Sequence, residues 1–248
     1  MTSTPGSAGT TVALVTGGTS GIGAAVADRL SADGFDVVTL ARTKPTVTAH
    51  RFLQTDVTDR ASLEAVRRTL ESEGATIGVL VTAAGTNVRA PALEVSDSDI
   101  RRMIDVNLYG TIASFQVFAP LMLQHPNSRF VAIGSVSGAY GMNLRAVYGA
   151  TKAAVSGLVR SLAIEWAPHG ATVNAVGPGV IDTPLTAGYI ERFPARAQAL
   201  IDHTPVGRLG VPQDVAATVS FLASEGSSFI TGQTIYPDGG LSAGCSWW

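Results

Sequence analysis

Two residues in one stretch of the chain, Tyr148 and Lys152, could together move a proton. They are four positions apart in the segment 146–166, whose pattern is typical of a helix, so both side chains lie on one helical face. A cation beside a phenol favours the phenolate and pulls the phenol pKa down from about 10. The pair would then serve as proton donor and acceptor for a carbonyl and an alcohol. The alternative is an ordinary surface pair of tyrosine and lysine, which occurs on many helices.

A third candidate, Ser135, lies thirteen residues before Tyr148. It follows an apolar run at 130–133 that predicts a strand. In open parallel sheets, ligands bind beyond the carboxyl ends of the strands, so a hydroxyl at this position faces the ligand crevice. Ser135 could hold a carbonyl oxygen there while Tyr148 delivers the proton. Alternatively, its hydroxyl only caps the turn before Gly138.

A glycine-rich turn near the N-terminus could bind a phosphate group. The strand predicted at 12–15 is followed by Thr16-Gly17-Gly18-Thr19-Ser20-Gly21-Ile22-Gly23 and then directly by a helical pattern. Glycine lets the backbone turn sharply and approach a pyrophosphate, and the amides at the start of the new helix point at the anion. The turn therefore predicts a dinucleotide site, and the charge of an oxidised nicotinamide would reinforce the effect of Lys152 on Tyr148. A purely structural turn is the alternative.

These groups need a scaffold that brings strand ends and helix starts together. Short β-branched runs alternate with longer helical patterns along the chain, which is typical of a parallel sheet with crossover helices. The expected strands are 12–15, 37–40, 51–54, 79–82, 130–133, 172–176 and 234–236, and the expected helices begin near Ser20, Asp59, Asp97, Ala146, Leu185 and Pro212. We therefore expect one doubly wound α/β domain at 11–248, with a parallel seven-stranded sheet and helices on both faces, after a flexible tail at 1–10.

Composition and charge exclude several function classes. The net charge of −2 and a pI near 6.1 argue against nucleic acid as a partner, because nucleic-acid readers carry a dense basic patch. The single cysteine, Cys245, and four scattered histidines predict neither an internal disulfide nor a structural metal site. The first ten residues lack the features of a signal peptide, and polar residues interrupt the uncharged stretch 106–128. We therefore expect a cytoplasmic protein without a membrane span and without a bound metal.

Landmark residues keep a common order and spacing along nearly the whole chain, from about Thr11 to Gly240. They are TGGTSGIG at 16–23, Asp56-Val57 after the third predicted strand, Ala84-Gly85 after the fourth, Asn107, Ser135, Tyr148 with Lys152, Pro178-Gly179 with Thr183, and Asp238-Gly239-Gly240. In these residues the sequence resembles the short-chain dehydrogenase/reductase family. The resemblance implies a Rossmann-type fold and an oxidoreductase that transfers a hydride between a nicotinamide cofactor and a carbonyl or secondary alcohol.

The resemblance also implies a role for each matching residue. Tyr148 would be the general acid and base, Lys152 would hold the nicotinamide ribose and depress the phenol pKa, and Ser135 would orient the carbonyl. Asn107 would anchor a water molecule that links Lys152 to bulk solvent. The cofactor would be bound by Gly17, Thr19, Ser20, Gly21, Ile22, Gly23, Asp56, Val57, Ala83, Ala84, Gly85, Pro178, Gly179, Ile181 and Thr183, together with Tyr148 and Lys152. Thr82-Ala83 replaces the usual pair of asparagines, so a brace between neighbouring strands is missing.

The residues after the second predicted strand favour NADP(H) over NAD(H). An NAD site needs an acid at the end of this strand, about 20 residues past the glycine loop, to accept hydrogen bonds from the ribose 2′-hydroxyl. That position is Ala41, and Asp36 is at the opposite end of the strand. Arg42 follows instead, and its guanidinium could stack on the adenine and pair with a 2′-phosphate, with Thr43 and Lys44 adding donors. A solvated basic turn is the alternative, and Thr19 stands where many NADP-dependent relatives place a second basic residue.

A second function class remains open, a non-catalytic protein that senses dinucleotides on the same fold, because fold does not imply function. A sensor does not need residues that transfer protons. Asn107, Ser135, Tyr148 and Lys152 are all present, so we expect an enzyme.

The substrate is poorly determined by the sequence. The segment 185–204 follows the Pro178-Gly179 turn, where relatives carry a mobile lid, and other crevice candidates are Asn87, Arg89, Tyr140, Met142 and Asn143. The segment 185–204 mixes Tyr189, Ile190, Phe193 and Ala195 with Arg192 and Arg196. The apolar majority of the crevice candidates favours a medium-sized, partly hydrophobic ketone, either polyketide-like or cyclic. A β-ketoacyl thioester on a carrier protein is the rival, and Arg89 leaves room for a sugar acid.

The sequence predicts a homotetramer or at least a homodimer. Apolar residues recur at helical spacing between Ile104 and Leu123, and this stretch has no charged outer face, so both of its sides need cover. One side can pack on the sheet, and the other would meet a second subunit together with the helix at 146–166. Trp247 and Trp248 at the C-terminus would also need shelter.

Overall fold

The computed structural model describes residues 11–47 and 49–244. Its seven strands form one parallel sheet in the order β3-β2-β1-β4-β5-β6-β7. The strands are β1 (Thr11–Thr16), β2 (Asp36–Ala41), β3 (Arg51–Gln54), β4 (Thr76–Thr82), β5 (Arg129–Ile133), β6 (Thr172–Val176) and β7 (Thr234–Ile235). Because the order runs outward from β1 in both directions, the crossover helices lie on both faces, as the sequence predicted.

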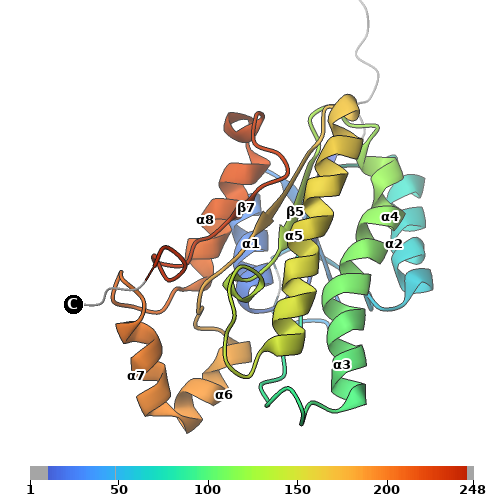
Figure 1. The fold of residues 1–248 in the computed structure, drawn as a ribbon. Helices are drawn as coiled ribbons and strands as arrows, with labels where there is room; N and C mark the ends of the chain where they lie inside the picture. Colours follow the sequence, from blue (N-terminus) through green and yellow to red (C-terminus); the bar gives the residue numbers. More distant parts are fainter. Residues whose placement is uncertain (1–10, 48, 245–248) are drawn as a thin grey trace, which may run out of the picture.

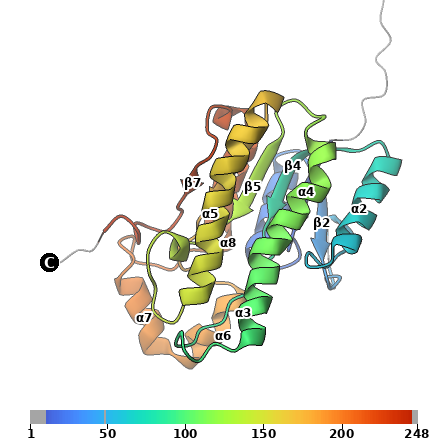
Figure 2. The same cartoon turned by 45° about the vertical axis from the view of Figure 1, so that its right-hand side comes forward.

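Helices cover the two faces of the sheet (Figures 1 and 2). One face is packed by α1 (Gly21–Ala32) and α8 (Pro212–Ala223), and the other by α2 (Arg60–Ser72), α4 (Gly110–Met122) and α5 (Ala146–Trp166). Along β1, Val12 and Leu14 point into the core under α2, α4 and α5, whereas Ala13 and Val15 point into the core under α1 and α8. The near-continuous apolar strands therefore result from burial on both sides.

Local signals explain why most elements begin where the sequence predicts. Asp59 caps α2, since its carboxylate accepts a hydrogen bond from the Ala61 amide at 3.0 Å. Pro212 occupies the first position of α8, where its missing N–H group is not needed. β4 begins three residues before its predicted start because Gly78 bulges out of the pairing with β1, which interrupts the apolar pattern without ending the strand.

The chain from Asp97 to Met122 forms one continuous helical rod. It begins as α3 (Asp97–Ile104), widens into a π-helical turn at Asp105–Tyr109 and continues as α4. Such turns are rare and occur frequently at functional sites. The sequence predicted a buried helix here, but it did not predict the π-helical turn.

The helix predicted to begin near Leu185 is α6 (Pro184–Arg192), and a second helix, α7 (Pro194–Asp202), follows it. The sequence did not predict α7, which begins at Pro194 because proline lacks the N–H group that a continuous helix requires. Both helices lie beyond the carboxyl ends of the strands (Figure 1).

Two further findings concern features that the sequence singled out. The hydroxyl of Thr82, where the family usually has asparagine, is buried without a hydrogen-bond partner in the described part of the chain. This agrees with the missing brace between neighbouring strands.

Among the described residues, no helix is both long and apolar enough to cross a membrane. The tail at 1–10, Cys245 and the two C-terminal tryptophans lie outside the described residues.

Candidate active site

A cleft of about 1210 Å³ lies beyond the carboxyl ends of the strands. It gathers segments that are far apart in the sequence, from the glycine turn after β1 to the loop after β6. The cleft is lined by Gly17, Thr19, Ser20, Gly21, Ile22, Gly23, Arg42, Thr43, Asp56, Val57, Ala83, Ala84, Gly85, Ser135, Tyr148, Lys152, Pro178, Gly179, Ile181 and Thr183. Every predicted site residue except Asn107 therefore borders one cavity.

The glycine turn leaves room for a ligand backbone. Gly17 has a φ of +66°, and a Cβ there would lie 2.7 Å from the Ala84 nitrogen, so only glycine fits. Ser20 precedes α1, but its side chain makes no capping hydrogen bond, and no acid occupies the first turn of this helix. In the described structure the first amides of α1 therefore remain available to an anion. This arrangement fits the pyrophosphate of a dinucleotide.

The end of β2 carries a cation and no acid. Ala41 is the last residue of the strand, and Arg42 is exposed where it borders the cleft. Asp36 pairs with Val12 at the start of the strand, whereas Leu40 pairs with Thr16 at its end. Asp36 is therefore at the wrong end to reach a ligand in the cleft.

Asp56 adds a negative charge opposite Arg42. Burial opposes its ionisation, but hydrogen bonds from the Thr58 hydroxyl (2.7 Å) and amide (2.9 Å), together with the Arg42 charge, outweigh burial and lower the Asp56 pKa. The carboxylate is thus ionised and held in place at this end of the cleft.

Tyr148 and Ser135 meet at the opposite end of the cleft. The Ser135 hydroxyl forms a hydrogen bond with the Tyr148 phenol and accepts one from the Ser137 amide at 3.1 Å. Burial raises the pKa of Tyr148, and the bond to Ser135 and the charges of Arg145 and Arg89 offset only part of that effect. The sequence predicted that Lys152 lowers the Tyr148 pKa. In the structure, burial has the larger effect, so the Tyr148 pKa is raised instead.

Lys152 lies behind the phenol. Its Nζ is 5.9 Å from the centroid of the Tyr148 ring and donates a hydrogen bond to the Ile133 carbonyl at 2.8 Å. The side chain is buried, and burial lowers the pKa of Lys152 from 10.5 to about 8. The Lys152 ammonium is thus a buried cation close to the Tyr148 phenol.

Asn107 does not border the cleft and instead braces its wall from the π-helical turn. Its Oδ1 accepts a hydrogen bond from the Thr86 amide (2.8 Å), and its Nδ2 donates to the Thr86 carbonyl (2.9 Å) and to the Thr151 hydroxyl (3.1 Å). A Cβ at Gly85 would lie 3.5 Å from Asn107 Oδ1 and 3.9 Å from Lys152 Nζ. Asn107 and Lys152 therefore flank Gly85, and a water-anchoring role for Asn107 remains a prediction.

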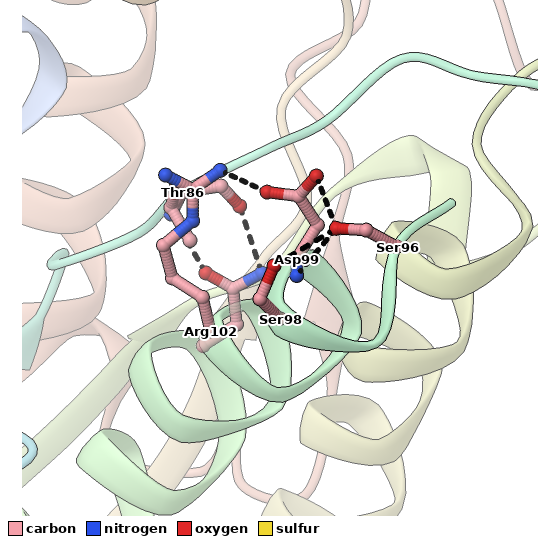
Figure 3. Close-up of polar contacts among 6 residues, drawn as sticks. Thr86, Ser96, Ser98, Asp99 and Arg102 are labelled. Carbon is pink, nitrogen blue, oxygen red and sulfur yellow. Dashed lines mark hydrogen bonds and ion pairs between the residues drawn. The ribbon is translucent and has the colours of Figure 1, made fainter. Parts of the chain in front are cut away.

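Helix α3 forms part of the wall of the cleft, which the sequence did not predict. Figure 3 shows that Ser96 caps this helix by accepting a hydrogen bond from the Asp99 amide (3.1 Å) and donates to the Asp99 carboxylate (2.9 Å). Arg102 donates to the other carboxylate oxygen of Asp99 at 2.7 Å, and both Arg101 and Arg102 border the cleft. The motif Ser96-x-x-Asp99 predicts the cap, but no sequence signal shows that this helix faces the site.

Comparisons with known proteins agree with this geometry. Residues 17–242 match the protein family described as Enoyl-(Acyl carrier protein) reductase. The chain is 37% identical over 231 residues to the 3-oxoacyl-(acyl-carrier-protein) reductase MabA of Mycobacterium tuberculosis, which covers 93% of this chain and 92% of that protein. The chain belongs to the short-chain dehydrogenase/reductase family. It is therefore an oxidoreductase that acts on a C=O or CH–OH group.

Solved structures of other short-chain dehydrogenases/reductases share the fold. The ligand-free aldohexose dehydrogenase AldT of Thermoplasma acidophilum superimposes with a TM-score of 0.91 at 34% identity, covering 96% of each chain. ElxO, solved with NADP bound, superimposes with a TM-score of 0.88 at 30% identity and covers 95% of this chain and 100% of its own. The Rossmann-type fold that the sequence predicted is thus confirmed.

The buried Lys152 of this short-chain dehydrogenase/reductase leads to a prediction about stability. Since burial lowers its pKa from 10.5 to about 8, a charged Lys152 at neutral pH costs the folded protein about 3 kcal/mol. Lys152→Met should therefore raise the free energy of unfolding by about 1–3 kcal/mol at about pH 7, even though it removes a catalytic candidate.

The pH dependence tests the cause of that gain. Above about pH 8 the folded lysine releases its proton while the unfolded lysine keeps it until about pH 10.4, so wild-type stability rises across this window. Urea denaturation of both proteins at about pH 7 and pH 10 should show the advantage of Lys152→Met shrinking at the higher pH. An advantage that stays constant would mean that Lys152 is not the titrating group.

Proposed function

We propose that this protein is an NADP(H)-dependent ketoreductase that acts on a medium-sized, partly hydrophobic ketone. The observation that carries the proposal is the single cleft that joins Ser135, Tyr148 and Lys152 at one end to Arg42 at the other. A dinucleotide would fit along it, with its pyrophosphate at the first amides of α1.

The chain's own residues would orient the carbonyl and supply its proton. Ser135 would donate a hydrogen bond to the carbonyl oxygen and hold it beside the Tyr148 phenol. When bound, reduced nicotinamide supplies the hydride that the carbonyl carbon accepts. Tyr148 would then give its proton to the carbonyl oxygen, and the buried Lys152 ammonium would stabilise the phenolate that remains. In the reverse direction the phenolate would take the proton of the alcohol.

The preference for NADP(H) rests on the end of β2. Arg42 would pair with the 2′-phosphate through charge-assisted hydrogen bonds, with Thr43 as a further donor. Position 41, the last residue of β2, is an alanine, so it carries no carboxylate that would repel the phosphate. The NADP bound to the relative ElxO supports the same choice of cofactor.

Two other substrate classes have support in the names of relatives. MabA is named as a 3-oxoacyl-(acyl-carrier-protein) reductase, which favours a β-ketoacyl thioester as the rival substrate. AldT is named as an aldohexose dehydrogenase, which keeps a sugar or sugar acid open. A non-catalytic sensor would not need Ser135, Tyr148 and Lys152 in one cleft.

A panel assay tests the proposed function. Purified protein is mixed with NADPH and in turn with cyclic ketones, polyketide-like diketones, a β-ketoacyl thioester and, in the reverse direction, a sugar acid with NADP⁺. Among the uncharged members of the panel, we expect the fastest change in NADPH absorbance with an apolar ketone. The absence of turnover across the whole panel would favour the sensor instead.

We also propose that the protein is a homotetramer or homodimer that associates through the outer faces of the helical rod at 104–123 and of α5. The rod and α5 lie side by side on one face of the molecule (Figure 2). Ile104 and Tyr109 on the rod are each 41% exposed, and Ile164 on α5 is 78% exposed. Light scattering at micromolar concentration should give two or four times the chain mass of 25.5 kDa. A mass of one chain would contradict this.

A further inference from the structure

A second cavity of about 460 Å³ adjoins the catalytic end of the cleft. It is lined by Arg89, Met142, Asn143, Leu144, Arg145, Val180 and Leu200. Three of these residues, Met142, Arg145 and Val180, border both cavities, so the second cavity continues the first beyond Tyr148. Its position makes it the space for the part of a substrate that does not react.

Two cations dominate the charge of this second cavity. Arg89 comes from the loop after β4, and Arg145 immediately precedes α5, with its guanidinium carbon 5.3 Å from the centroid of the Tyr148 ring. Both side chains are partly buried, and the charges of both lower the pKa of the same phenol. Among the described residues that line this cavity, two are cationic and none is acidic.

The backbone that presents Arg145 is strained and fixed. Leu144 has a φ of +63°, a left-handed conformation that a leucine rarely adopts. The Leu144 carbonyl accepts a hydrogen bond from the Ala90 amide at 3.3 Å, which connects the Arg89 loop to the Arg145 loop. Strain of this kind persists only where the surroundings impose it, and it is concentrated at ligand-binding sites.

We propose that Arg89 and Arg145 bind an anionic oxygen group of the substrate while its carbonyl lies at Ser135 and Tyr148. Guanidinium groups match carboxylates and phosphates through paired hydrogen bonds, and both arginines border the same cavity. The apolar walls formed by Leu144, Val180 and Leu200 would take the carbon skeleton. The substrate class is therefore an apolar oxo acid, or a thioester whose carrier arm bears a phosphate, and this inference rests on the proposed function.

Matched pairs of substrates test the inference directly. The assay compares kcat/KM for benzoylformate and levulinate with their methyl esters, and for an acetoacetyl thioester of phosphopantetheine with that of N-acetylcysteamine. We expect the wild type to prefer the charged member of at least one pair by about tenfold or more. The preferred pair distinguishes a carboxylate from a phosphate. A ratio near one or below in every pair would overturn the proposal.

Variants then assign the preference to the two arginines. Arg89→Gln and Arg145→Gln should each bring the charged-to-neutral ratio close to one, mainly through a higher KM for the charged substrate. Arg89→Lys, which keeps the charge but loses the planar fork, should retain part of the ratio. Arg68→Gln removes the same charge from an exposed position on α2 and serves as the control with an unchanged ratio. Ratios that stay at the wild-type value in both glutamine variants would overturn the proposal.

Binding separates a failure of this site from a failure of the proposed function. The same acids and the phosphopantetheine thioester are titrated calorimetrically into protein saturated with NADP⁺. If the wild type binds one of them and Arg89→Gln does not, the arginine site is supported even where no turnover occurs, and only the proposed function fails. If none of them binds to the wild type, the arginine site is wrong.

Discussion

Tyr148→Phe will abolish ketone reduction while leaving the cofactor bound. The ring that lines the cleft persists in this variant, and only the transferable proton is lost. General acid catalysis contributes a factor of about 10²–10⁴, so kcat should fall to roughly one per cent of the wild-type value or less. Steady-state kinetics with NADPH give kcat, and NADPH fluorescence titration gives the cofactor Kd, which should change by less than about threefold.

A second tyrosine provides the control. Tyr109→Phe removes a hydroxyl from a partly exposed position on the α3–α4 rod, outside the cleft, and should keep wild-type kcat. If Tyr148→Phe retains more than about five per cent of wild-type kcat, Tyr148 is not the general acid and base. A loss of NADPH binding in that variant would mean instead that the hydroxyl serves the cofactor.

Exchanging two residues at the end of β2 will reverse the cofactor preference. Ala41→Asp combined with Arg42→Ala replaces a cation that can pair with the 2′-phosphate by a carboxylate that repels it and can bond the ribose hydroxyls. We expect the wild type to favour NADPH by about tens-fold rather than thousands-fold, because Thr19 supplies no second cation in the glycine turn. The double variant should favour NADH.

The ratio of kcat/KM for NADPH to that for NADH, measured on one ketone, decides this prediction. Lys44→Ala is a useful comparison because Lys44 borders the same end of the cleft but lies further from the strand end, so its effect should be smaller than that of Arg42→Ala alone. A wild-type ratio of one or below would show that Arg42 does not bind the 2′-phosphate of NADPH.

The positions of the glycine turn and of the end of β2 could be predicted because local chemistry dictates them. Gly17 combines a positive φ with a backbone approach that admits no Cβ, so the sequence must display glycine there. The end of a strand can likewise be located from its β-branched run, which placed Ala41 and Arg42 correctly. These features depend on neighbours in the sequence and remain visible without the structure.

The features that the sequence missed depend on packing between distant segments. The burial that lowers the Lys152 pKa and raises that of Tyr148 arises where α5 packs against the end of β5, which no spacing rule reveals. The π-helical turn at Asp105–Tyr109 has no local signature, although it places Asn107 against Thr86. Arg145 precedes Tyr148 by three residues in the sequence, but only the fold shows that Arg145 and Arg89 line the same second cavity.

In the proposed reaction, NADPH bound in the cleft would supply the hydride to the carbonyl carbon, and Tyr148 would protonate the carbonyl oxygen. Reaction of the preferred ketone with NADPH that carries deuterium at the transferable position, followed by mass spectrometry and NMR of the product, tests the claim most directly. We expect an alcohol with one deuterium at the carbinol carbon in a single configuration, formed by the wild type and not by Tyr148→Phe. Product without deuterium, or deuterated product formed equally well by Tyr148→Phe, would contradict it.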